Sequence, residues 1–220
     1  MFFFPVGCLI FALFILFLPV LFALGYFHII TIGFEKLGIS PEAVIILLLV
    51  ILIGSAINIP LGRKKLKYVE ESRFFGLWRV PKVATEGIAI NVGGAVIPIL
   101  LSFYFLFQIW RAGFDINQIF IATALMVVVC KLLAKVVPGK GIVIPAFIPP
   151  IFAVVFALFF ASGFVAPCAF VSGTFGVLIG ADLLNLRRIR KYGGFLSIGG
   201  AGVFDGIFLI GIISALLAGF

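Results

Sequence analysis

Six polar side chains stand within or at the ends of long apolar stretches of this sequence, and they are the first candidates for chemistry. They are three carboxylic acids and three amides: Glu86, Asp182, Asp205, Asn58, Asn91 and Asn185. Carboxylate and amide oxygens are the ligands that Mg²⁺, Ca²⁺ and Mn²⁺ prefer. The sequence has one histidine and three widely spaced cysteines, so it offers no cluster that would favour zinc. The set therefore predicts a site for a divalent cation of one of these three kinds.

Two of the acids also allow a second chemistry, because neighbouring carboxylates can share one proton and act as a catalytic dyad. Intramembrane aspartyl proteases of the presenilin type use such a pair, in a Tyr-Asp and a Gly-x-Gly-Asp motif. This chain has Ala181-Asp182 and Phe204-Asp205 at the corresponding places, so neither motif is reproduced. A protease using Asp182 and Asp205 is therefore the alternative to a cation site.

Two further interpretations use the same acids without catalysis. Asp182 is followed by Arg187 and Arg188, with which it could form an ion pair at the membrane interface. Asp205 lies in a stretch with no basic residue, which suits the proton or cation site of a secondary transporter.

Composition shows which elements must position these residues. The chain has 220 residues, of which 64% are hydrophobic and 11% are charged, whereas a soluble domain has about 25% charged residues. These values exclude a water-soluble globule and a disordered chain. They indicate an all-α, polytopic membrane protein with one transmembrane domain over residues 1–220 and the lipid bilayer as its partner. The net charge of +8 is then expected in cytoplasmic loops rather than at a nucleic-acid interface.

Charge-poor stretches of about 20 residues, the length needed to cross a bilayer, predict seven transmembrane helices. They lie near 2–30, 43–61, 87–110, 116–137, 142–166, 168–186 and 196–219. The fifth and sixth come from one apolar stretch, 141–181, which would be about 60 Å long as a helix and must fold back once. Ala166-Pro167 is the expected break, because the residue before a proline disfavours the helical conformation. Residues 62–86 are expected to form a basic cytoplasmic loop.

The distribution of basic residues predicts the orientation. With the N-terminus in the cytoplasm, fourteen of the sixteen lysines and arginines fall on the cytoplasmic side, as the positive-inside rule requires. These are Arg63, Lys64, Lys65, Lys67, Arg73, Arg79, Lys82, Lys131, Lys135, Lys140, Arg187, Arg188, Arg190 and Lys191. We therefore expect a multi-pass protein of the cell membrane with a cytoplasmic N-terminus and an outside C-terminus. All six candidate residues then belong to the cytoplasmic third of the membrane.

Two pairs of segments indicate an internal repeat. LIGSAIN at 52–58 is similar to LIGADLLN at 178–185, and INVGGAV at 90–96 is similar to LSIGGAGV at 196–203. The pairs occur in the same order and four predicted helices apart. The expected arrangement is therefore a parallel duplication of helices one to three and five to seven, in which the two halves meet about one axis.

The segments LIGADLLNL and SIGGAGVFDGIFLIGI, which carry Asp182 and Asp205, resemble a prokaryotic, largely archaeal family of membrane proteins known as DUF1614. The resemblance covers most of the chain. It implies seven helices and an internal polar cavity with a divalent cation, and it carries over Asp182, Asp205 and Glu86 as acids of that cavity. It implies no reaction. The overall expectation is a membrane protein with a cytoplasm-facing acidic cavity that binds Mg²⁺, Ca²⁺ or Mn²⁺, of unspecified substrate and oligomeric state.

Overall fold

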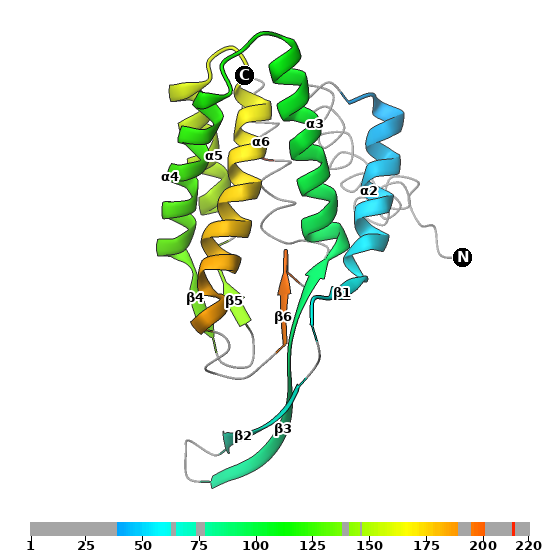
Figure 1. Ribbon diagram of the computed structural model, residues 1–220, viewed down its shortest axis with the longest axis vertical. Coiled ribbons are helices and arrows are strands. Elements are labelled where there is room, and N and C mark those ends of the chain that lie inside the picture. The colour runs from blue at the N-terminus through cyan, green and yellow to red at the C-terminus, as the bar shows by residue number, and fades with distance from the viewer. Residues whose placement is uncertain are drawn as a thin grey trace, which may run out of the picture.

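The computed structural model describes residues 39–62, 65–73, 78–137, 141–145, 147–188, 195–200 and 213. Helices dominate this part of the chain and stand side by side as a bundle, and the strands gather at one end of it (Figure 1). We call this end the strand end. The expectation of a mostly helical protein is confirmed. The predicted helix at 2–30 lies outside the described residues, as does most of the one predicted at 196–219.

The described ranges contain five α-helices and three shorter helical turns. They are α2 (Pro41–Ser55), η1 (Val92–Val96, π-helical), α3 (Ile97–Arg111), α4 (Asn117–Leu133), α5 (Ile148–Phe160), α6 (Val165–Phe175), η2 (Gly176–Asp182, π-helical) and η3 (Leu183–Asn185, 3₁₀-helical). Two runs are continuous, so Val92–Arg111 and Val165–Arg188 form helices of 20 and 24 residues that are long and apolar enough to cross a bilayer. They correspond to the helices predicted at 87–110 and 168–186.

The apolar stretch 141–181 folds back earlier than the sequence predicted. α5 ends at Phe160 and α6 begins at Val165, so the reversal lies before Ala166-Pro167. Pro167 instead lies in the first turn of α6. A proline is tolerated there because the first N–H groups of a helix have no partner within the helix.

The segment 62–86, expected to be a basic loop, contains a long β-hairpin. β2 (Lys65–Arg73) and β3 (Trp78–Asn91) are antiparallel, and Lys65 lies opposite Glu86. Because β3 continues to Asn91, the next helix begins at Val92 rather than at residue 87. The signal was present in the sequence as polar and apolar residues that alternate, for example Lys-Leu-Lys-Tyr at 65–68, a period typical of strands.

The inner part of β3 also organises the strand end. β1 (Asn58–Pro60) pairs with it antiparallel and β6 (Phe195–Ile198) pairs with it parallel. β6 takes the place of the first residues of the helix predicted at 196–219. The sheet thus brings together the chain that leaves α2, the chain that enters η1 and the chain that leads into residues 201–220. A separate pair of short strands, β4 (Lys135–Val137) and β5 (Gly141–Val143), follows α4.

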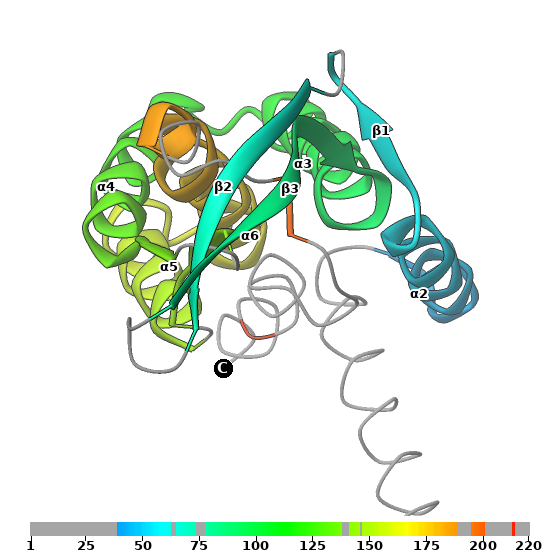
Figure 2. The same cartoon turned by 90° about the horizontal axis from the view of Figure 1, so that it is seen from below.

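α6 and η2 form the centre of the bundle, in contact with α3, α4 and α5 (Figure 2). Glycines allow η2 to approach α4 closely. A Cβ atom on Gly176 would lie 2.5 Å from the Cβ of Met126, and one on Gly180 would lie 2.4 Å from the carbonyl oxygen of Val127. Any larger residue at these two positions would therefore force the two helices apart.

The outward faces of the surrounding helices are apolar and exposed. Leu100 and Trp110 on α3, Leu132 on α4 and Phe159 on α5 have exposed fractions between 63% and 81%. In the central helix Val165–Arg188, by contrast, 72% of an 18-residue apolar window is buried. An apolar surface outside and small residues at the helix contacts is the pattern of helices packed in lipid.

Candidate functional site

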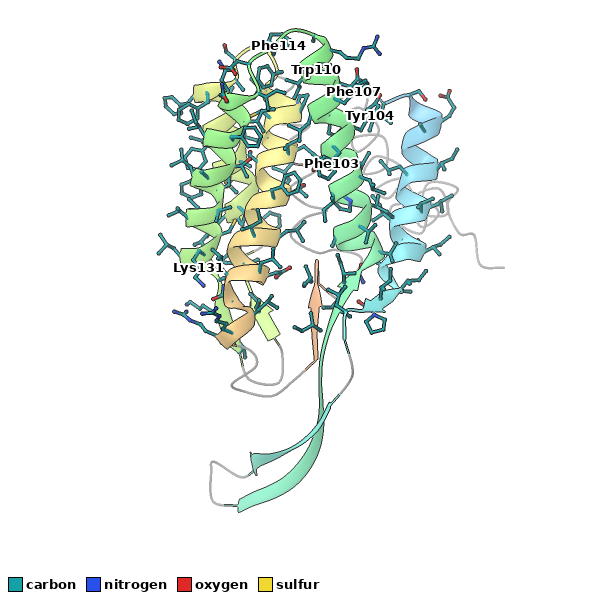
Figure 3. All side chains as sticks on the ribbon, in the orientation of Figure 1. Phe103, Tyr104, Phe107, Trp110, Phe114 and Lys131 are labelled. Atoms are coloured by element: carbon teal, nitrogen blue, oxygen red, sulfur yellow. The ribbon has the colours of Figure 1, made fainter. Side chains whose placement is uncertain are left out.

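The predicted site residues lie at the strand end of the bundle. Four of them are described there with their side chains: Asn58, Asn91, Asp182 and Asn185. Figure 3 shows this end with Lys131, opposite the end that carries Trp110 and Phe114. Glu86 lies on β3, six residues before η1 begins at Val92. Asp205 lies outside the described residues.

Asn91 joins the end of α2 to the beginning of η1. Its side chain is 1% exposed, and its Oδ1 accepts a hydrogen bond of 2.7 Å from the N–H of Gly94, which caps the new helix. Its Nδ2 donates to the carbonyl oxygen of Ser55 at 2.7 Å and to Oδ1 of Asn58 at 3.2 Å. Both ends of the Asn91 amide are therefore used to hold protein segments together.

Asn58 links this pair to β6. Its Oδ1 accepts a hydrogen bond from Asn91 and a second one, of 2.5 Å, from the hydroxyl of Ser197. Ser197 was not among the predicted site residues. The sequence did contain a signal for it, because Ser197 takes the place of Asn91 when LSIGGAGV is aligned with INVGGAV.

Asn185 stabilises the point where the central helix changes from the π-helical turn η2 to the 3₁₀-helical turn η3. It is fully buried, and its Nδ2 donates to the carbonyl oxygens of Ala181 at 2.8 Å and Gly180 at 3.4 Å. Its Oδ1 accepts a 2.8 Å hydrogen bond from Nζ of Lys131, which also donates to the carbonyl oxygen of Leu184 at 2.8 Å. Helical carbonyls lose their regular partners where π-helical and 3₁₀-helical turns meet. Asn185 and Lys131 supply replacement donors, and the sequence did not predict this role for Lys131.

Asp182 is a buried carboxylate at the last position of η2. It is 8% exposed, and its Oδ2 accepts a hydrogen bond of 2.8 Å from the N–H of Gly199. Gly199 directly follows β6 and has a φ of +83°, a conformation that favours glycine. Asp182 therefore connects the end of η2 to the turn from which the chain continues toward Asp205.

This turn is pressed against η1. A Cβ atom on Gly94 would lie 2.0 Å from the carbonyl oxygen of Gly199, and one on Gly199 would lie 2.6 Å from the Cβ of Ala95. The neighbouring Gly93 approaches α2 in the same way, since its Cβ atom would lie 2.5 Å from the backbone nitrogen of Ser55. Three of the four glycines that suggested a repeat, Gly93, Gly94 and Gly199, are thus positions of close backbone contact.

The donor chemistry of this end can be compared with that of a cation site. The side-chain oxygens of Asn58, Asn91 and Asn185 already accept hydrogen bonds from protein groups. Asp182 accepts a hydrogen bond from Gly199 at one carboxylate oxygen, and carboxylate oxygens are the ligands that hard divalent cations prefer. In the part of the chain that the structure describes, no group of three histidine, cysteine, aspartate or glutamate side chains is placed to hold a metal ion.

These features define a mostly helical bundle with an apolar perimeter and a buried acid in a polar network at one end. The chain belongs to the DUF1614 family, described as proteins of unknown function, whose model matches residues 52–217. The family resemblance expected from the sequence is therefore confirmed. No curated protein and no solved structure matches the chain.

Proposed function

We propose that this protein is a multi-pass protein of the cell membrane, with seven helices, a cytoplasmic N-terminus and an outside C-terminus. The exposed leucine, phenylalanine and tryptophan side chains around the bundle support this proposal, because such a surface is stable against acyl chains and unfavourable in water. The basic side chains also favour the orientation. Lys131, Lys135, Arg187 and Arg188 lie at the strand end, and Arg111 lies at the other end.

We further propose that the strand end binds one divalent cation, Mg²⁺, Ca²⁺ or Mn²⁺, through carboxylate oxygens. The observation that carries this proposal is the position of Asp182, an acid that is 8% exposed at the end of η2, within the central apolar helix. Carboxylate oxygens are the ligands that these cations prefer, and a buried, low-dielectric position strengthens the attraction between a carboxylate and a cation. Asp182, Asp205 and Glu86 are the proposed ligands. Asn58, Asn91 and Asn185 would position the segments that carry them.

The test is metal binding by the purified full-length protein in lipid nanodiscs, measured from the electron paramagnetic resonance signal of free Mn²⁺. We expect one bound ion, and a loss of about tenfold or more in affinity for Asp182→Asn or Asp205→Asn, because an amide keeps the shape and loses the charge. Asp115→Asn is the matched control, since Asp115 is exposed at the far end, where it accepts a hydrogen bond from the N–H of Asn117.

Unchanged Mn²⁺ affinity in both aspartate variants, or no binding by the wild-type protein, would overturn the cation site. The same variants separate it from the alternative of an aspartyl protease. A dyad of Asp182 and Asp205 would cleave a membrane-helix substrate equally well in the presence of a metal chelator, and both asparagine variants would abolish that cleavage.

A further inference from the structure

A second polar position lies deeper in the bundle, at the contact between α3 and α6. The rings of Phe105 and Phe170 meet edge to face with centroids 5.2 Å apart, and those of Phe103 and Phe175 are 6.0 Å apart. α3 runs away from the strand end and α6 runs back toward it (Figure 1). One helical turn from the Phe105–Phe170 pair toward the strand end therefore leads to Ser102 on α3 and Thr174 on α6.

The hydroxyl of Thr174 differs from the other buried hydroxyls nearby. Ser102 donates to the carbonyl oxygen of Pro98 at 2.8 Å, and Ser172 donates to that of Ala169 at 3.4 Å. Thr174 is fully buried, and its Oγ1 has no hydrogen-bond partner in the part of the chain that the structure describes. Buried polar groups that protein atoms do not satisfy are typically satisfied by an internal water molecule.

Thr174 lies on nearly the same side of the central helix as Asp182. Eight residues correspond to about 2.2 turns of an α-helix, and the intervening π-helical turn η2, which has more residues per turn, brings this closer to two full turns. The rise is then about 12 Å or less. Ser172 lies two residues from Thr174 and therefore on the opposite side of α6.

We propose that the seam between α3 and α6, from Asp182 to Ser102 and Thr174, is hydrated and admits water and small cations from the strand end. This inference rests on the proposed function, because the entrance of the seam is Asp182, which is assigned there to the cation site. The hydroxyls of Ser102 and Thr174 would be its inner polar lining, with the side chains of Leu178 and Pro98 between them and the entrance. Hydration that reaches this depth suits a protein that moves a small cation better than one that only holds it.

The test uses cysteine accessibility in sealed membrane vesicles. Cys8, Cys130 and Cys168 are first replaced by alanine, and Thr174→Cys, Ser102→Cys and Ser172→Cys are introduced singly. A positively charged methanethiosulfonate reagent reacts only with thiols that water can ionise. We expect Thr174→Cys and Ser102→Cys to react about tenfold faster than Ser172→Cys, and only when the reagent is added on the side where Arg188→Cys reacts.

Equal rates for Thr174→Cys and Ser172→Cys, or labelling of Thr174→Cys from the side where Arg111→Cys reacts, would overturn the proposal. Adding Asp182→Asn should weaken Mn²⁺ binding by about tenfold or more and leave the labelling of Thr174→Cys in place, so a failed cation site and a failed seam give different results. If the cysteine-free protein does not fold, Thr174→Val in the wild-type protein replaces the test. A dry orphan hydroxyl predicts that valine raises the melting temperature, whereas a hydrated seam predicts no increase.

Discussion

The contact between Gly94 and Gly199 leaves no room for a methyl group, so Gly94→Ala tests how the strand end is assembled. The added Cβ would lie 2.0 Å from the carbonyl oxygen of Gly199 and 3.4 Å from Oδ1 of Asn91. The first of these atoms belongs to the backbone of the Gly199 turn. Asp182 holds this turn in place, because its Oδ2 accepts a 2.8 Å hydrogen bond from the N–H of Gly199. The turn cannot move away without breaking that bond.

The magnitude follows from two opposing effects. Alanine favours a helix over glycine by about 1 kcal/mol, whereas forcing an extra methyl group into a packed interior costs about 1–3 kcal/mol or more. A separation of 2.0 Å to a backbone atom is far shorter than the contacts that real Cβ atoms make, which essentially never fall below 3.0 Å, so the cost should dominate. We expect a net loss of about 2 kcal/mol, which corresponds to a fall in melting temperature of about 4–8 °C for a chain of this length.

The assay is thermal unfolding of the purified protein in nanodiscs, with Gly62→Ala as the control. A Cβ on Gly62 would meet no atom within 4 Å, so this variant should melt within about 1 °C of wild type. Gly94→Ala should also weaken Mn²⁺ binding, because displacement of the turn moves the chain that leads to Asp205. A Gly94→Ala protein as stable as Gly62→Ala would refute the arrangement of η1 against the Gly199 turn.

Two further substitutions test the polar network. Lys131→Met removes the donor to the carbonyl oxygen of Leu184 and to Asn185, and it should lower the free energy of unfolding by about 1–2 kcal/mol. The control is Lys135→Met, at an exposed position on β4, which should leave the midpoint of chemical unfolding unchanged. Asn91→Asp keeps an acceptor for Gly94 but places a carboxylate oxygen against the Ser55 carbonyl, now 2.7 Å from Nδ2. Asn91→Asp should therefore lower stability by about 3 kcal/mol. The control is Asn117→Asp, an exposed change in the first turn of α4. Equal melting temperatures for these two variants would show that Asn91 does not link α2 to η1.

Several features of the strand end could be read from the sequence, because they depend on residue type and order. Acids and amides inside apolar stretches drew attention to Asp182, Asn91, Asn58 and Asn185, and the structure places these four at one end of the bundle. The matching glycine pairs suggested that two distant hairpins meet. The parallel pairing of β3 with β6 and the contact of Gly94 with Gly199 support that hypothesis.

What the amides do could not be read in the same way. An asparagine in an apolar stretch has the same sequence signature whether its oxygen binds an ion or an N–H group. Asn91 and Asn185 serve as caps and bridges because α2, η1 and η2 end beside them, and that arrangement exists only in the folded chain. Lys131 and Ser197 were missed for the same reason, since their partners lie 54 and 139 residues away.

The sequence by itself determined that the chain is mostly helical, that it belongs to its family and that its polar groups gather at one end. The length of apolar stretches, the spacing of glycines and the placement of charges are local properties of the sequence, so their effects do not depend on the rest of the fold. Only the tertiary structure decided that residues 65–73 and 78–91 pair as antiparallel strands, because strand pairing depends on contacts among many residues rather than on local preference alone. It also decided that Asp182 meets the Gly199 N–H and that Thr174 is buried without a partner in the described chain, since both depend on which surfaces pack against the central helix.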